Sequence, residues 1–134
     1  MLFLQLSTMP DNNKQSVLII EKDNAILDNL SKRFKMQEML VITAKDGFEG
    51  YTRACNESPN FIVSETLLPS MNGFRLSRLL KFDERYKNIP IVLLTSNNLD
   101  TVQDMFRASG ADQILGKPFR FRDLMEKITD MVAV

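Results

Sequence analysis

The sequence predicts a single α/β domain built on a parallel sheet. Five apolar runs of strand length recur along the chain, and each is followed by a segment with helical periodicity. Alternation of this kind produces a parallel sheet with helices on both faces, because each right-handed crossover lays its helix against the sheet. A length of 134 residues suits one domain with its own core.

The predicted strands are mostly unbroken apolar runs, which is typical of strands buried on both faces. The first two cover residues 16–21 (SVLIIE) and 39–44 (MLVITA). The third is the run FIV at 61–63, which leads into Ser64 and Glu65. The fourth and fifth cover residues 91–95 (IVLLT) and 112–116 (DQILG).

Between and after the strands, apolar residues recur at helical spacing and predict five helices. We expect Asp23 or Asn24 to cap the first helix, and Gly110 to end the fourth, near 99–109. The positions predicted to face the core share this spacing: Ile26, Leu27, Leu30, Phe34, Phe48, Tyr51, Ala54, Phe74, Leu76, Leu79, Leu80, Val102, Met105, Phe106, Phe121, Leu124, Met125, Ile128 and Val132.

Composition excludes several classes of protein. Seventeen basic and seventeen acidic residues give a net charge of zero, so no charge field favours nucleic acid or an anionic membrane. A single cysteine, Cys55, excludes an internal disulfide, and the absence of histidine removes the usual zinc ligands. A reducing cytoplasm is the expected compartment. Residues 1–15 are predicted to form a loose tail without signal or membrane-spanning character, and residues 16–134 the domain.

Polar residues follow the predicted strands where the carboxyl ends of parallel strands open onto a crevice. They are Glu21, Lys22 and Asp23 after the first strand, Glu65 at the end of the third, Thr95 and Ser96 after the fourth, and Lys117 after the fifth. Such a set could hold a hard cation with an anion, or its charges could neutralise one another.

Four short motifs carry a resemblance to a known family. They are LPSMNG at 68–73, IPIVLLTS at 89–96, GAD at 110–112 and KPF at 117–119. In this order and spacing the chain resembles, from Val17 to about Met131, the receiver domain of two-component response regulators. The resemblance implies a flavodoxin-like, doubly wound (βα)5 fold with strand order 2-1-3-4-5.

The resemblance also implies roles for residues of the crevice. Thr95 resembles the hydroxyl that bonds a phosphoryl oxygen, Lys117 resembles the cation that pairs with it, and Glu21 matches the first member of an acidic pair. Three positions depart from the family pattern. Lys22 replaces a magnesium ligand, Glu65 replaces the phosphoacceptor aspartate, and Ile114 replaces the aromatic switch residue.

These departures predict a site that is phosphorylated very slowly or not at all. The Lys22 ammonium would repel magnesium and could pair with Glu65 or Glu21. The extra methylene of Glu65 displaces its carboxylate, and such misplacements can cost about 100-fold in rate. We therefore expect no cofactor; magnesium is disfavoured, although Asp23 could supply a displaced ligand.

Two interpretations of the charged crevice stay open. In the first, Glu65 permanently imitates the phosphorylated state, with Thr95 or Lys117 as its partner. In the second, Glu65, Glu21, Lys22, Asp23 and Lys117 form only a partly exposed cluster of ion pairs, worth about 0 to 1 kcal/mol each.

The predicted function is that of an atypical receiver, not an enzyme, which acts through protein contacts. The resemblance places the contact region at about Leu99 to Met131, with Val102, Phe106, Ile114, Phe119 and Phe121 as candidates. The partner would be a histidine kinase or a downstream effector, and a homodimer is compatible with this prediction. The main alternative is a magnesium-dependent receiver that accepts phosphate on Glu65 or another residue. Flavin binding is disfavoured by the acids after the first strand, and DNA binding by the lack of a basic stripe.

Overall fold

The computed structural model describes residues 14–132. Its strands are β1 (Ser16–Ile20), β2 (Leu40–Ala44), β3 (Phe61–Glu65), β4 (Ile91–Thr95) and β5 (Gln113–Gly116). Its helices are α2 (Asn24–Met36), α3 (Gly47–Glu57), α4 (Gly73–Lys81), α5 (Gln103–Ser109) and α6 (Phe121–Val132), with a 3-10 turn, η2 (Leu99–Val102), before α5. Residues 1–13 of the predicted tail lie outside the described residues.

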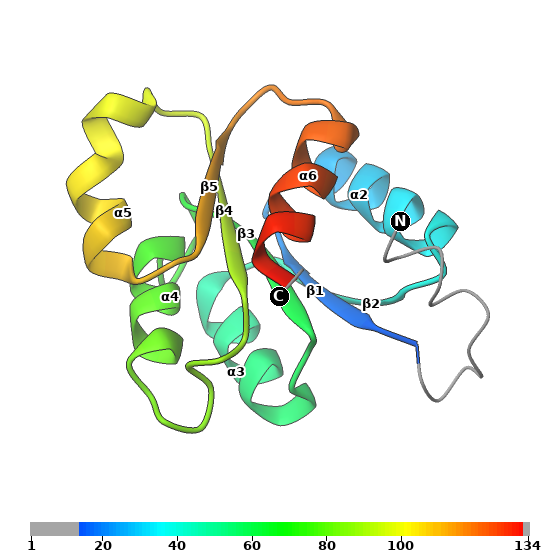
Figure 1. Ribbon diagram of the computed structural model, residues 1–134, viewed down its shortest axis with the longest axis horizontal. Coiled ribbons are helices and arrows are strands. Elements are labelled where there is room, and N and C mark those ends of the chain that lie inside the picture. The colour runs from blue at the N-terminus through cyan, green and yellow to red at the C-terminus, as the bar shows by residue number, and fades with distance from the viewer. Residues whose placement is uncertain (1–13, 133–134) are drawn as a thin grey trace.

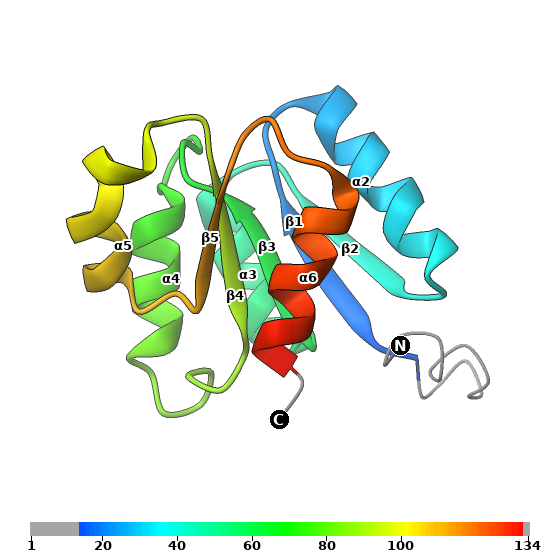
Figure 2. The same cartoon turned by 45° about the horizontal axis from the view of Figure 1, so that its top comes forward.

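The predicted fold is confirmed. All four strand pairings are parallel, and the order is β2-β1-β3-β4-β5. Helices α2 and α6 cover one face of the sheet, while α3, α4 and α5 cover the other (Figures 1 and 2). The chain therefore forms three layers, with the sheet between two layers of helices.

Alternate residues of the central strands supply the two halves of the core, because successive side chains of a strand point to opposite faces. In β1, Val17 and Ile19 pack toward α2 and α6, whereas Leu18 and Ile20 pack toward α3 and α4. Every residue of β3 and β4 is buried. Unbroken apolar runs are thus explained by burial on both faces.

Side chains cap three helices as their sequences indicate. Asp23 accepts a hydrogen bond from the Ile26 amide at the start of α2, which decides between the two predicted caps. Asp46 caps α3 and Asn72 caps α4 in the same way. Gly110 ends α5 with a φ of 71°, a conformation that favours glycine.

The prediction that three residues face the core is wrong. Phe48, Leu79 and Met105 are 63%, 38% and 47% exposed. On α3 the buried positions are Gly47, Gly50 and Ala54, small residues that allow the helix to lie close to the sheet and leave Phe48 outside. On α5 the preceding 3-10 turn changes the helical phase, so that Met105 faces outward.

Val102, predicted as a partner contact, is only 3% exposed and belongs to the core. The other four candidates on that face, Phe106, Ile114, Phe119 and Phe121, are half-buried. The exact strand ends also differ by a residue from prediction: β1 ends at Ile20, β2 begins at Leu40 and β5 begins at Gln113.

The sheet register brings the predicted crevice residues to one edge. Ile20 lies beside Ser64, Glu65 beside Leu94, and Thr95 beside Gly116. The residues that follow these positions, Glu21 and Lys117, therefore leave the sheet at the same end as Glu65.

Candidate functional site

A half-buried lysine joins two buried carboxylates at this edge. The Nζ atom of Lys117 lies 2.6 Å from Oε1 of Glu65 and 2.7 Å from Oε1 of Glu21. The Glu21 and Glu65 side chains are 1% and 4% exposed, and that of Lys117 is 13% exposed. The three strands β1, β3 and β5 are thereby tied together through one ammonium group.

The pKa values of Glu65 and Lys117 shift in the directions expected for a buried ion pair. Burial disfavours the ionised carboxylate of Glu65, but hydrogen bonds from Lys117 and from the backbone outweigh it and hold the pKa of Glu65 below its ordinary value. Burial disfavours the charged amine of Lys117, but bonds to Glu21 and Glu65 outweigh it and raise the pKa of Lys117. Both groups are therefore charged at neutral pH.

The second oxygen of each carboxylate is held by the backbone. Oε2 of Glu65 accepts hydrogen bonds from the Thr66 amide, the Thr66 hydroxyl and the Leu67 amide. Oε2 of Glu21 accepts one from the Asp23 amide at 3.2 Å. All four oxygens of the two carboxylates therefore have a donor.

Lys22 pairs with neither Glu21 nor Glu65, although the sequence allowed such a pair. It is exposed, and its Nζ donates to the backbone carbonyl oxygen of Leu67 at 2.6 Å. Backbone carbonyl oxygens are among the ligands that hard cations use, and the ammonium of Lys22 occupies this one. No side-chain pattern in the sequence reveals this contact, because the acceptor is a backbone atom.

The side chains of the remaining predicted residues lie around the cluster without joining it. Asp23 is exposed and its Oδ1 caps α2 at 3.1 Å from the Ile26 amide. Thr95 is buried, and its hydroxyl accepts a hydrogen bond from the Asn97 amide at 3.1 Å. Among residues 14–132 no hydrogen bond joins Thr95 to Glu65, so of the two predicted partners of Glu65 the structure supplies Lys117. Ile114 packs half-buried against the core formed with α3, α4 and α5.

Glu65 is held from behind by a close approach of backbone to backbone. A Cβ atom on Gly73 would lie 2.3 Å from the Glu65 carbonyl oxygen, and the Gly73 amide donates to the Thr66 carbonyl at 2.8 Å. The start of α4 therefore fits against the end of β3 only because position 73 has no side chain.

Comparison with known proteins decides the family. Residues 17–129 match the response regulator receiver domain. The chain belongs to this family. The match covers β1 from Val17 onward, the other four strands in full and α6 as far as residue 129, so the predicted resemblance is confirmed at the level of the receiver domain.

Relatives of the receiver include regulators and kinases. Protein PilG of Pseudomonas aeruginosa is 29% identical over 112 residues, which are 84% of this chain and 83% of PilG. The DNA-binding dual master transcriptional regulator RpaA of Synechocystis is 35% identical over 114 residues, 84% of this chain and 46% of RpaA. A hybrid signal transduction histidine kinase D of Dictyostelium discoideum is 28% identical, but the chain spans only 8% of its length.

Solved receivers share the fold. The chemotaxis response regulator CheY4 of Vibrio cholerae superposes with a TM-score of 0.82 at 26% identity, over 89% of this chain and 99% of that one. A receiver domain of the Pseudomonas aeruginosa histidine kinase PA1611, solved with magnesium coordinated in its active-site cleft, gives a TM-score of 0.82 at 21% identity, over 90% and 99% of the chains. The chain is thus a receiver of ordinary architecture.

Magnesium is the metal that the family implies, and the oxygens of this site that it would need are bonded to ammonium groups in this structure. The oxygens that face the crevice from Glu21 and Glu65 are taken by the Lys117 ammonium, and the Leu67 carbonyl by that of Lys22. Within residues 14–132 no group of three or more acidic or cysteine side chains is placed to hold a metal. Two ammonium groups stand where a divalent cation would need open oxygen ligands.

Within the same described range no helix is long and apolar enough to cross a membrane.

Proposed function

We propose that this receiver domain signals through protein contacts and not through phosphorylation of Glu65. One observation carries the proposal: the half-buried Lys117 ammonium is bonded to both Glu21 and Glu65, while Lys22 is bonded to the Leu67 carbonyl. All four oxygens of the two carboxylates already have donors within the protein. An incoming phosphoryl group would have to displace these bonds without a cation to screen its oxygens.

The geometry favours the view that Glu65 imitates a modified state through Lys117. Its carboxylate bonds the lysine that resembles the family's phosphoryl-pairing cation. The imitation is partial, because the Thr95 hydroxyl is turned to the Asn97 amide. The alternative view, of weak and partly exposed ion pairs, agrees poorly with carboxylates that are 1% and 4% exposed.

The contact region is the face of η2, α5, β5 and α6, about Leu99 to Met131. Leu99 and Met105 are 40% and 47% exposed on this face, more than a core position would allow. Single exposed apolar side chains are ordinary on protein surfaces, so the choice of this face rests on the family resemblance, and Leu99 and Met105 are residues on it that a partner could contact. The partner is a signalling protein, either a histidine kinase or a downstream effector, and the domain acts as a binding module and not as an enzyme.

The test is intact mass after incubation with acetyl phosphate and magnesium. In a competent receiver a carboxylate oxygen of the aspartate attacks phosphorus. The bond between phosphorus and the acetyl oxygen breaks, and acetate leaves with its electron pair. The unmodified protein is compared with a Lys22→Asp, Glu65→Asp double variant, which serves as the control for donor competence. We expect an acid-labile phosphoryl mass only on the variant. A labile phosphoryl mass on the unmodified protein would favour the alternative, a magnesium-dependent receiver that uses Glu65 or another residue.

A further inference from the structure

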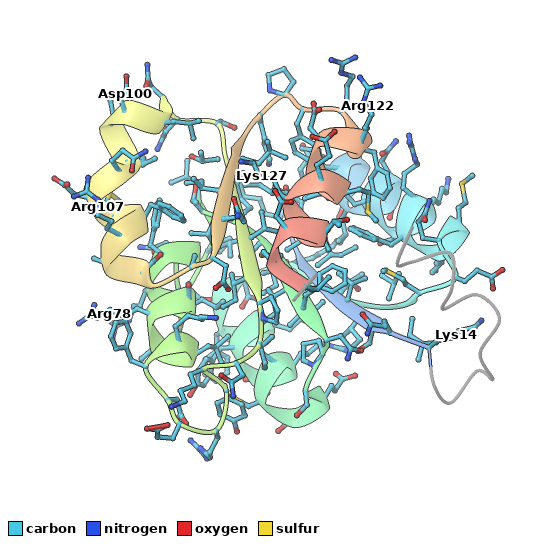
Figure 3. The ribbon with its side chains drawn as sticks, in the orientation of Figure 1. Lys14, Arg78, Asp100, Arg107, Arg122 and Lys127 are labelled. Atoms are coloured by element: carbon cyan, nitrogen blue, oxygen red, sulfur yellow. The ribbon has the colours of Figure 1, made fainter. Side chains whose placement is uncertain are left out.

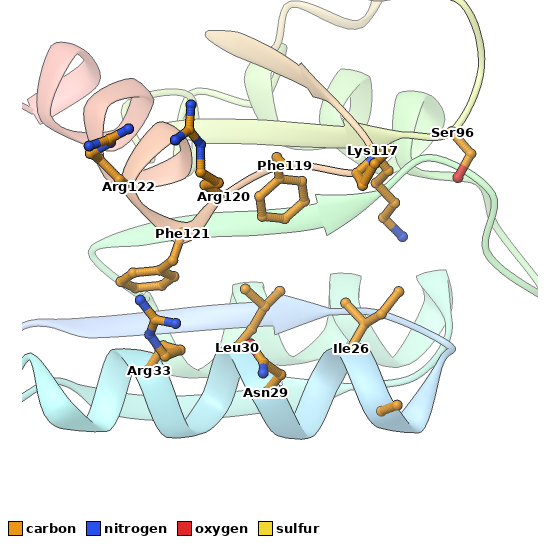
Figure 4. A pocket seen from close by; sticks show the side chains of 12 residues that line it. Ile26, Asn29, Leu30, Arg33, Ser96, Lys117, Phe119, Arg120, Phe121 and Arg122 are labelled. Atoms are coloured by element: carbon orange, nitrogen blue, oxygen red, sulfur yellow. The ribbon is translucent and has the colours of Figure 1, made fainter.

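An open groove of about 900 Å³ lies between α2 and the segment that joins β5 to α6. Figure 4 shows α2 along one side and the segment from Lys117 to Arg122 along the other. Its volume is in the range of sites that bury small organic ligands, roughly 300 to 1,000 Å³. The groove shares Lys117 with the ion pairs of the crevice, and it shares Phe119 and Phe121 with the contact region.

The floor of the groove is apolar and aromatic. Ile26 and Leu30 rise from α2, and the Phe119 ring projects toward them from the opposite wall (Figure 4). Farther along the groove, the Phe121 ring packs edge-on against the Phe34 ring, with 5.1 Å between the two ring centres. Aromatic rings that are held in place and half exposed offer a stacking platform for a flat ligand.

The rim carries positive charge only. Arg33, Arg120 and Arg122 line the groove, and none of the residues from 14 to 132 that line it is acidic. The Arg33 guanidinium lies 4.7 Å from the centre of the Phe121 ring, so one cation is already placed beside an aromatic face. Arg120 has only an exposed, loose pair with Asp123 at 3.8 Å. In a chain whose net charge is zero, this concentration of arginine indicates an anionic ligand.

We propose that the groove binds a nucleotide with two or more phosphates. The base would stack on Phe119 above Ile26 and Leu30, and the phosphates would meet the arginines of the rim. The residue types favour this ligand over an acidic peptide. Guanidinium forks match phosphate oxygens in pairs, and the aromatic floor suits a flat ring better than the narrow side chains of aspartate or glutamate.

Binding would also bear on the crevice, because Lys117 lines the groove while its ammonium holds Glu21 and Glu65. The ligand needs no magnesium from the protein. The inference does not depend on the proposed function: nucleotide binding can fail while the crevice stays inert to phosphate donors, and the reverse also holds.

Isothermal titration of the full chain with ATP in EDTA tests the proposal, with adenosine and tripolyphosphate as separate arms. We expect saturable binding of one ATP, at least about tenfold tighter than either fragment, since ring and phosphate contacts both contribute. Phe119→Ala should weaken ATP and adenosine but leave tripolyphosphate unchanged. An Arg120→Gln, Arg122→Gln double variant should weaken ATP and tripolyphosphate by about tenfold or more.

A matched control removes the same charge elsewhere. Arg53 and Arg107 are surface arginines outside the groove. Arg53 pairs with Glu57 at 3.1 Å, and Arg107 lies 3.7 Å from Asp104. Arg107 is on α5, and Arg122 is near the start of α6 at a separate part of the surface (Figure 3). An Arg53→Gln, Arg107→Gln double variant should bind ATP as the unmodified protein does, and each variant's thermal midpoint shows that it is folded.

Three results would overturn the proposal. The first is no saturable ATP binding up to about 1 mM at low salt, a limit that corresponds to roughly 4 kcal/mol of binding free energy. The second is equal weakening by the two double-arginine variants, which would mean diffuse charge attraction. The third is Arg122-dependent binding of an oligoglutamate peptide without binding of ATP, which would assign the groove to an acidic protein surface.

Discussion

The ammonium of Lys117 lies 2.6 Å from a carboxylate oxygen of Glu65, a residue 52 positions earlier in the chain. The contact joins the end of β5 to the end of β3, and the same ammonium reaches Glu21 after β1. One lysine therefore bonds two buried acids from separate strands. The stability of the sheet edge and the charge of the crevice depend on the same group.

Replacing Lys117 should be strongly destabilising. Lys117→Met leaves two buried carboxylates without their cation, and breaking a buried pair of this kind costs about 3 to 5 kcal/mol. Urea unfolding at pH 7 measures the change. Lys87→Met is the control, since Lys87 pairs with Glu84 on the surface and such pairs contribute about 0 to 1 kcal/mol. Equal effects of the two variants would contradict the view that the Lys117 cluster is buried and tightly coupled.

Glu65 should make stability depend on pH in the acid range. The folded state holds the pKa of Glu65 below its unfolded value of about 4.3, so the stabilisation is complete above that pH and is lost as pH falls through the folded pKa. Glu65→Gln should therefore flatten the fall of unfolding free energy below about pH 5. Urea midpoints measured from neutral to acid pH test this.

The control for the acid range is Glu57→Gln. Glu57 pairs with Arg53 on the surface at 3.1 Å, and its loss should leave the slope close to that of the unmodified protein. A slope that is the same in the Glu65 variant and the unmodified protein would show that this carboxylate gains nothing from its partners.

A methyl group at position 73 should disturb the site from behind. Gly73→Ala places a Cβ 2.3 Å from the Glu65 carbonyl oxygen, a backbone atom that cannot turn aside, and should destabilise by about 1 to 3 kcal/mol. Gly116→Ala is the matched control, because its nearest neighbour is a Leu99 side-chain atom at 4.0 Å. Thermal unfolding of the two variants distinguishes them, and a Gly73 variant as stable as the Gly116 variant would show that α4 shifts without cost.

Lys22 should be the residue that excludes magnesium. Lys22→Asp removes the ammonium from the Leu67 carbonyl and adds a carboxylate, so it should bind magnesium at least about tenfold more tightly than the unmodified protein. Lys22→Gln removes the charge without adding a ligand and should gain much less. Calorimetric titration with magnesium chloride measures all three, and unmodified protein that binds as tightly as Lys22→Asp would refute the role assigned to Lys22.

The strands and the site edge could be predicted because their signals are local. Unbroken apolar runs such as IVLLT at 91–95 are buried on both faces of the sheet, and the turn residues between elements set the crossovers. Parallel strands place their carboxyl ends at one edge, so Glu21, Glu65 and Lys117 had to lie near one another once the strand order was known. The order itself came from the family resemblance and not from periodicity.

Side-chain exposure on the helices was less predictable. Phe48 sits beside glycines that lower α3 onto the sheet, where the Cβ of a larger residue at position 50 would lie 2.5 Å from Ile20. Helical spacing shows which apolar residues share a face of a helix, but it does not show how closely that helix packs against the sheet. For the same reason spacing did not reveal that Met105 turns outward after the 3-10 turn.

The amino-acid sequence by itself determined the receiver fold, the edge at which the charged residues gather, and the substitutions that set Lys22 and Glu65 apart from the family pattern. Only the tertiary structure decided which hydrogen-bond and ion-pair partner each of these side chains has. Lys117 bonds both acids, whereas Lys22 bonds a backbone carbonyl and Thr95 accepts from the Asn97 amide. Charges and hydroxyls within one crevice have several partners in reach, and the choice depends on burial and on backbone atoms that side-chain patterns do not encode.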